Sequence, residues 1–147
     1  MQEIIEYIKQ AFDLKSQKCY KQAIEMLYKA LEIESDNIEI LFQLGELYFL
    51  LNNFQRSMQY LEKVLENNPN HVEALKLIQK IYKYTNEKEN AAKIAEKIYQ
   101  IQKNQDNLIN LIDALSASCN MTKISELEAL NSENDDVIYH IAKAFYD

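Results

Sequence analysis

Few side chains in this sequence could carry out chemistry, and they are widely spaced. His71 and His140 lie in different parts of the chain, and neither has cysteines or paired carboxylates near it at the spacing of metal ligands. Cys19 and Cys119 are far apart and show no paired spacing, so we expect free thiols in a reducing compartment. Gly45 is the only glycine, which excludes a glycine-rich phosphate loop. The sequence therefore predicts no enzyme active site, no metal site and no cofactor.

The charge and the hydropathy of the chain narrow its possible partners. It carries 16 basic and 23 acidic residues, a net charge of −7, whereas proteins that bind nucleic acids or anionic membranes need basic surfaces. The first residues do not form a basic segment followed by an apolar one. The longest apolar run, from Leu47 to Leu51, is far shorter than a membrane span. We therefore expect a cytoplasmic protein that binds neither nucleic acid nor membranes.

The elements that must position these residues are helices arranged in a repeat. One glycine and one proline leave almost no residues for the tight turns of a β-protein, and helix-forming residues dominate the chain. The apolar pattern recurs at a constant step of about 34 residues, and a fixed period of this length is typical of stacked supersecondary units. Positions that recur at this step include Ala11, Gly45 and Gln79; Ala23, Ser57 and Ala91; and Leu14, Tyr48 and Tyr82.

Each repeat contains two helical stripes with a short break between them. In the second repeat, apolar residues at helical spacing run from Ile40 to Leu51 and again from Phe54 to Leu65, with Asn52 and Asn53 between them. Pro69 ends the second stripe. We therefore predict one repeat domain over residues 1–147 whose helices form antiparallel pairs. The predicted helix pairs are 4–33, 38–67, 72–102 and 106–131, within repeats 4–37, 38–71, 72–105 and 106–134, followed by a half-repeat at 135–147.

The last predicted helix, near 135–146, is apolar on almost every side. Terminal units of a helical stack normally carry a polar outer face, because nothing covers them. Two explanations stay open. Either a partner covers this helix, which includes self-association through it, or the natural protein continues beyond residue 147.

The repeat pattern resembles the tetratricopeptide repeat. In the second repeat Leu41 stands at the tryptophan position of that family, Leu44 and Gly45 follow, and Tyr48 keeps the tyrosine. Ser57 takes the first alanine position, Leu61 the phenylalanine, and Pro69 the closing proline. The resemblance covers residues 4–105 well and the remainder weakly. It implies an all-α fold, a right-handed α-solenoid of helix-turn-helix repeats with about four pairs and a terminal helix.

The resemblance also implies a binding surface, because the first helix of each pair lines a concave groove in this family. The N-terminal part of this expected groove is apolar and aromatic, and the third repeat adds a row of lysines. Such a groove suits a peptide or an amphipathic helix with apolar anchors and acidic neighbours. The residues carried over to the expected groove are Ile8, Phe12, Phe42, Gln43, Glu46, Phe49, Leu50, Lys76, Leu77, Lys80, Lys83 and Tyr84.

Two other interpretations bear on this groove. Ile8, Phe12 and Phe42 could instead pack between neighbouring helices, since helix packing uses many such side chains. Family members that bind the acidic tails of heat-shock chaperones use a clamp of lysine, asparagine and arginine side chains. The matching positions here lack the cationic forks that a carboxylate needs, so we expect no such clamp. Those positions hold Ile8, Phe12, Gln43, Glu73 and Leu77.

The sequence therefore predicts a non-catalytic protein-interaction module that binds a peptide or helix of another protein in its groove. Two alternatives remain, namely a self-assembling structural scaffold and the recruitment arm of a longer multidomain protein. The identity of the partner is not encoded in any motif of the sequence.

Overall fold

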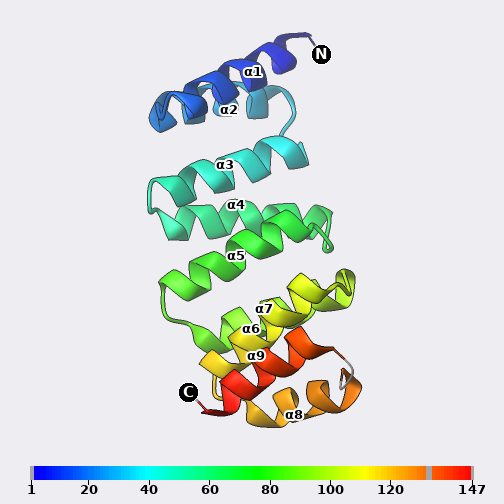
Figure 1. Cartoon of the computed structure of the whole chain (residues 1–147). Coiled ribbons are helices and arrows are strands. Elements are labelled where there is room, and N and C mark those ends of the chain that lie inside the picture. Colours follow the sequence, from blue (N-terminus) through cyan, green and yellow to red (C-terminus); the bar gives the residue numbers. More distant parts are fainter. Residues whose placement is uncertain (1, 132–133, 147) are drawn as a thin grey trace. The chain divides into compact units, whose positions relative to one another are not determined.

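The structure is a computed structural model and describes residues 2–131 and 134–146. These residues form helices joined by short connections. The chain divides into two compact units, Met1–Ala74 and Leu75–Asp147. The division falls within the fifth helix, which is labelled α5 in Figure 1. Unit 1 contains α1 (Gln2–Ser16), α2 (Tyr20–Ile33), α3 (Ile38–Leu50), α4 (Phe54–Asn67) and the first residues of α5 (Val72–Tyr84). Unit 2 contains the rest of α5 together with α6 (Lys88–Ile101), α7 (Gln105–Ala117), α8 (Met121–Leu130) and α9 (Asp135–Tyr146).

The turns inside the helix pairs have a common structure that uses no glycine. Lys18, Asn52, Asn86 and Cys119 all adopt the left-handed conformation, with φ between 56° and 61°. After Asn52, for example, the Asn53 N–H donates to the carbonyl of Tyr48, and the Asn52 N–H donates to that of Phe49. This pair of bonds is a Schellman motif, which satisfies carbonyl groups at the end of the first helix. A short turn then leads directly into the second helix of the pair.

Asparagine side chains cap the N-termini of five helices. Asn37, Asn53, Asn104, Asn120 and Asn134 each precede a helix, and each side chain accepts a hydrogen bond from the backbone N–H of the third residue after it. Such caps satisfy N–H groups that the helix itself cannot, and each contributes about 1 kcal/mol. The caps and the left-handed turns together fix where each helix of a pair begins and ends.

The spacing of the left-handed residues shows that the fourth helix pair comes one position early. The step from Lys18 to Asn52 equals the step from Asn52 to Asn86, whereas the step from Asn86 to Cys119 is shorter by one position. The same shift appears at the start of α7. Two full repeat steps after the cap Asn37 would end one position beyond Asn104, which is the cap of α7. Because α6 keeps the regular step, the missing residue lies in the connection between α6 and α7.

Close approach of the helices in a pair depends on small residues. A Cβ placed on Gly45 of α3 would lie only 2.8 Å from Leu61 Cδ2 and 3.0 Å from Leu61 Cγ of α4. Beside it, the buried Ser57 hydroxyl donates a 2.7 Å hydrogen bond to the carbonyl oxygen of Gly45. The small residues that the sequence pattern singled out at these positions therefore let α3 and α4 pack directly against each other.

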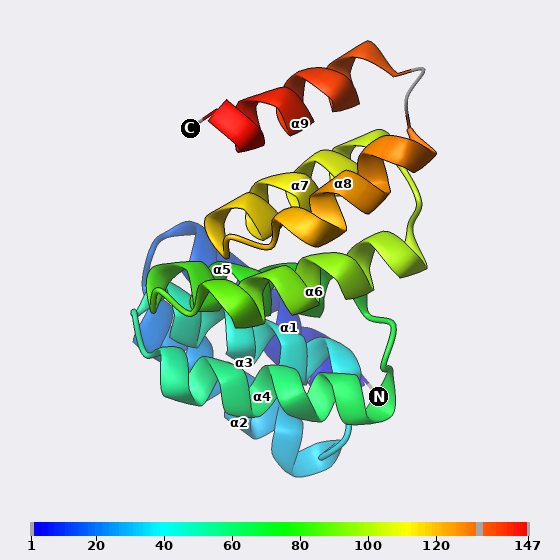
Figure 2. The ribbon, with the colours of Figure 1, turned by 90° about the horizontal axis from the view of Figure 1, so that it is seen from below.

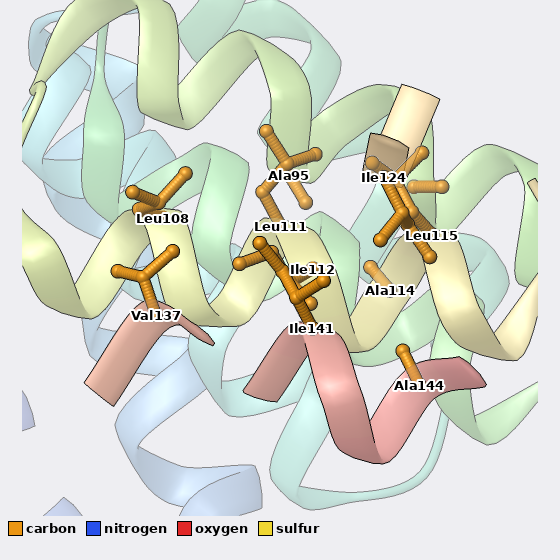
Figure 3. Packing of buried hydrophobic residues seen from close by; sticks show 11 residues of the cluster. Ala95, Leu108, Leu111, Ile112, Ala114, Leu115, Ile124, Val137, Ile141 and Ala144 are labelled. Carbon is orange, nitrogen blue, oxygen red and sulfur yellow. The ribbon is translucent and has the colours of Figure 1, made fainter. Parts of the chain in front are cut away.

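The core of unit 2 is formed by α6, α7, α8 and α9. Figure 2 shows α7 between α6 and α9, in agreement with the contacts that α7 makes with both helices. Val137, Ile141 and Ala144 are the buried residues of α9, and in Figure 3 Ile141 points toward Ile112 of α7. Ile124 is the buried residue of α8 and completes the same cluster.

Three tyrosines from three helices form a hydrogen-bonded cluster in unit 1. The Tyr28 hydroxyl of α2 lies 2.7 Å from that of Tyr48 of α3 and 3.0 Å from that of Tyr60 of α4. The Tyr48 and Tyr60 rings stack with their centroids 5.7 Å apart. Arg56 donates a 2.9 Å hydrogen bond to the Tyr48 hydroxyl. The cluster thus connects α2, α3 and α4 through polar contacts at the edge of the apolar core.

This cluster predicts a loss of stability in alkaline solution. Burial raises the pKa of Tyr28 above its ordinary value of 10.0, and burial together with the Tyr28 hydrogen bond raises the pKa of Tyr48. A raised pKa means that the folded state holds its proton more tightly, so this stabilisation is complete below the ordinary pKa and is lost as pH rises through the raised one. We expect the thermal midpoint of unfolding to fall more steeply with pH above about 10 in the native chain than in Tyr28→Phe. Tyr139→Phe, at an exposed position, is the control, and equal slopes in all three proteins would contradict the prediction.

Candidate functional site

In unit 1 the residues predicted for the groove lie on α1 and α3 and differ widely in exposure. Phe12 and Leu50 are 44% and 42% exposed, so both present apolar surface. Ile8, Phe42, Glu46 and Phe49 are half-buried, and Gln43 is buried. Ile5 was not among the predicted groove residues, but it is 65% exposed. It stands on α1 at the repeat position that Glu39 holds on α3. The helices therefore expose several large apolar side chains at groove positions.

A lysine that the sequence analysis missed connects α1 to α3 within this surface. Lys15 Nζ donates to Gln43 Oε1 at 3.0 Å and to Glu46 Oε2 at 2.7 Å. Gln43 in turn donates to Glu39 Oε1 at 2.9 Å. The Lys15 ammonium also lies 5.8 Å from the centroid of the Phe12 ring. Gln43 and Glu46 are thus engaged in holding the two helices together, which leaves them little capacity for direct contact with a partner.

The two central phenylalanines of α3 make ring contacts inside unit 1. The centroids of Phe42 and His71 lie 5.1 Å apart, and those of Phe49 and Phe54 lie 5.7 Å apart. His71 Nδ1 accepts a hydrogen bond from the Ala74 N–H, so this histidine begins α5 as a cap. Phe42 and Phe49 therefore serve packing and still keep part of their surface exposed.

In unit 2 the predicted residues lie on α5. Lys76, Lys80 and Lys83 are exposed and share one face of the helix, whereas Leu77 is only 8% exposed and offers almost no surface. Tyr84 is 70% exposed. Among residues 2–131 and 134–146, none of the three lysines has a carboxylate within ion-pair distance.

A pair of amide side chains connects α5 to α7. Gln79 and Asn110 exchange two hydrogen bonds, of 3.1 Å and 3.0 Å, and Lys83 Nζ donates to Asn110 Oδ1 at 3.2 Å. Farther along α7, Asp113 Oδ1 lies 3.2 Å from Nδ1 of His140 on α9. These contacts fix polar groups of α5, α7 and α9 relative to one another.

The described residues include few groups at the spacing that metal binding or a disulfide needs. Within that part of the chain no three histidine, cysteine, aspartate or glutamate side chains come together as metal ligands. Cys19 and Cys119 are free thiols. None of the described helices is long and apolar enough to cross a membrane. The exposed side chains of α1, α3 and α5 include large apolar groups and ammonium groups.

The repeat in this sequence matches a known family of helical repeats. The profile of the tetratricopeptide repeat matches residues 14–81, from the end of α1 into α5. Residues 14–81 therefore consist of tetratricopeptide repeats. A search of curated proteins found no match.

Solved structures of tetratricopeptide-repeat proteins share the fold. MamA from Desulfovibrio magneticus RS-1 superposes with a TM-score of 0.77 at 17% identity, over 98% of this chain and 84% of that one. The first repeat domain of Spaghetti (RPAP3), bound to the HSP90 peptide SRMEEVD, gives a TM-score of 0.66 at 18% identity, over 87% and 94% of the two chains. YrrB, described as having an unusual peptide-binding site, gives 0.71 at 14% identity, over 95% and 74%.

Small residues stand at several packing positions of the first two repeats. Ala11, Gly45, Ala23 and Ser57 allow helices to approach closely, and all are buried. The contact between Lys15 and Glu46 follows no family motif. Its only signal in the sequence is a lysine near the end of one first helix and a glutamate late in the next first helix, and such combinations are common by chance.

Proposed function

We propose that this tetratricopeptide-repeat protein is a non-catalytic interaction module that binds a segment of a partner protein on the face of α1 and α3. The observation that carries the proposal is the exposure of Ile5, Phe12 and Leu50, three large apolar side chains at groove positions of two neighbouring first helices. A contiguous exposed apolar surface is typical of interaction sites, and we propose that these side chains contribute to one such surface. The two free thiols support a reducing compartment, which we take to be the cytoplasm.

The half-buried Phe42 and Phe49 complete the proposed surface, which we call the apolar face and define as Ile5, Phe12, Phe42, Phe49 and Leu50. An extended peptide or a helix would place apolar anchors on it. Lys15 lies within the face but is neutralised by Glu46, so the face attracts a partner through apolar contact rather than charge. Lys76, Lys80 and Lys83 of unit 2 form a separate surface that would attract acidic groups of a partner.

The test selects binders to the full chain from a random peptide library and measures the affinity of the best peptide by calorimetry. We expect Phe12→Ser with Leu50→Ser to weaken binding by about tenfold or more, the scale of buried apolar anchors. These exposed residues are preferred to Phe42 and Phe49, whose loss would also remove ring contacts inside unit 1.

The matched control is Ile33→Ser, because Ile33 of α2 is 47% exposed but lies outside the apolar face. It removes similar apolar surface and should leave the affinity unchanged. Equal affinity of the Phe12/Leu50 variant and the Ile33 variant would show that peptides bind elsewhere on the chain.

A further inference from the structure

The repeat places a lysine at the same position in both units, and only one of the two is neutralised. Lys15 near the end of α1 and Lys83 near the end of α5 are separated by two full repeat steps, because each stands at the same place ahead of a left-handed turn residue, Lys18 or Asn86. In unit 1, Lys15 donates to the amide oxygen of Gln43 at 3.0 Å and to the carboxylate of Glu46 at 2.7 Å.

The corresponding partners in unit 2 can be assigned from the turns. The separation between the caps Asn37 and Asn104 equals the separation between the left-handed residues Asn52 and Cys119, so α7 follows α3 with one constant offset. The same offset pairs Gln43 with Asn110, and Glu46 with Asp113.

Only half of the unit 1 arrangement is kept in unit 2. Lys83 donates to Asn110 Oδ1, as Lys15 does to Gln43. Asp113, however, pairs with His140 of α9 instead of Lys83, with 3.2 Å between Oδ1 and Nδ1. In the described part of the chain Lys83 therefore keeps its amide partner and has no carboxylate at ion-pair distance.

The open position beside Lys83 is a cavity of about 230 Å³. Lys83, Lys88, Asn86 and Asp113 provide its polar groups, and three alanines line the rest, Ala91, Ala114 and Ala117. Figure 3 shows Ala114 beside Leu115 in the core cluster of α7, which gives this side of the cavity a firm support. A carboxylate side chain is much smaller than this volume and can enter it.

The charge around the cavity favours an anion. Residues 75–103 contain seven lysines and three glutamates, although the whole chain has a net charge of −7. Lys76 and Lys80 lie on the same face of α5 as Lys83, at helical spacing, and neither has an acidic partner in the described residues. Like charges at this spacing repel one another, and an anionic ligand would relieve that repulsion.

We infer that this cavity binds a carboxylate from an acidic segment of a partner protein. The partner's aspartate or glutamate takes the place beside Lys83 that Glu46 occupies beside Lys15, with Lys88 as a second donor. Neighbouring acidic residues of the segment lie along Lys80 and Lys76. Gln79 orients Asn110 and so fixes the Lys83 ammonium. Asp113 also lines the cavity, and its contact with His140 keeps it from pairing with Lys83. The inference rests on the proposed interaction function and names the chemistry of the partner.

The probe is an acetylated and amidated hexapeptide of alternating alanine and glutamate, titrated into the full chain and followed by amide chemical shifts. We expect shifts at Asn86, Ala114 and the Asn110 side chain, and none with the peptide in which glutamine replaces glutamate. Lys83→Gln should weaken binding by about fivefold or more. Lys97 is exposed and does not line this cavity, so Lys97→Gln should change the affinity by less than about twofold. Equal effects of the two substitutions would overturn the inference.

A second pair of variants tests the role of His140 without touching the lysines. His140→Ala frees Asp113 to pair with Lys83, so we expect weaker binding of the glutamate peptide, and Asp113→Asn in that background should restore it. Binding that is unchanged in His140→Ala, or not restored in the double variant, would contradict the arrangement proposed here. A retained thermal midpoint confirms that α9 stays folded.

Two further measurements separate this site from a general polyanion surface and from the apolar face. A single-stranded oligonucleotide of equal charge should not shift the same amides, and equal affinity for it would show a polyanion surface instead of a carboxylate site. The probe has no large apolar side chain, so Phe12→Ser with Leu50→Ser should leave its affinity unchanged. Failure of the apolar face and failure of this site are therefore distinguishable.

Discussion

Replacing Ile141 with glutamate is expected to detach α9 from unit 2. Ile141 is 2% exposed and packs in one cluster with Leu111 and Ile112 of α7, so a glutamate there would bury a carboxylate without a partner (Figure 3). Burial of an unpaired charge belongs to the few mechanisms that cost more than about 4 kcal/mol. Hydrogen exchange of the α9 amides should therefore lose its protection, and the thermal midpoint of unit 2 should fall.

Ile138→Glu is the matched control for this prediction. Ile138 lies on the same helix but is 37% exposed, so its carboxylate can stay in water. We expect amide protection in α9 to remain close to that of the native chain. Similar loss of protection in both variants would mean that α9 is held by something other than its buried face.

The second large effect concerns the contact between Gly45 and Leu61. Leu61→Ala removes a fully buried side chain and is expected to lower the free energy of unfolding by about 2–5 kcal/mol. Gly45→Ala alone should also destabilise, by about 1–2 kcal/mol, because its new methyl group would lie 2.8 Å from Leu61 Cδ2. In the Leu61→Ala background that space is empty, so Gly45→Ala should instead stabilise, by up to about 1 kcal/mol, through its better helix propensity.

Urea unfolding of the four proteins in this double-mutant cycle measures the coupling between the two positions. The change of sign for Gly45→Ala is the decisive result. An equal effect of Gly45→Ala in both backgrounds would show that α3 and α4 can separate slightly without cost. Glu62→Ala, an exposed change next to Leu61, should alter stability by less than about 0.5 kcal/mol.

The helix pairs could be predicted from the sequence because their signals are local. The apolar stripes of 38–67 correspond to α3 and α4, with Asn52 and Asn53 in the turn, and the range 135–146 coincides with α9. The expected all-α repeat fold and the family are confirmed. The fourth pair was harder to place. Nothing in its composition shows that one residue is missing before α7, and Cys119 is not a residue type that indicates a left-handed turn.

The last helix shows the limit of an apolar pattern. From the sequence, α9 is apolar on almost every side, and Ile138 and Ile141 appear equivalent. Only the packing of α7 against α9 distinguishes them, by burying Ile141 and leaving Ile138 accessible. Among the described side chains of α9, Ile138, Tyr139 and Phe145 are large, apolar and exposed, and self-association through them stays a prediction.

The candidate site could be predicted only in part, because side-chain pairing between repeats is not local. Family positions directed attention to Phe12, Leu50 and the lysines of α5, which the structure places on the surface. They could not show that Gln43 is buried and bonded to Lys15, or that Asp113 bonds with His140 and not with Lys83. These contacts depend on the exact offset between helices, which the structure supplies and a periodic pattern does not.

The arrangement of helices in unit 1 also has a consequence for how the chain reaches its native state. Its helix contacts join α1 to α2, α2 to α3 and α3 to α4, which are successive in the chain, and each pair is closed by a short hydrogen-bonded turn. Contacts of such low sequence separation require little loop closure, so the barrier to folding is small. A helix hairpin can therefore begin to form as soon as its two helices have left the ribosome, before the remainder of the chain is synthesised.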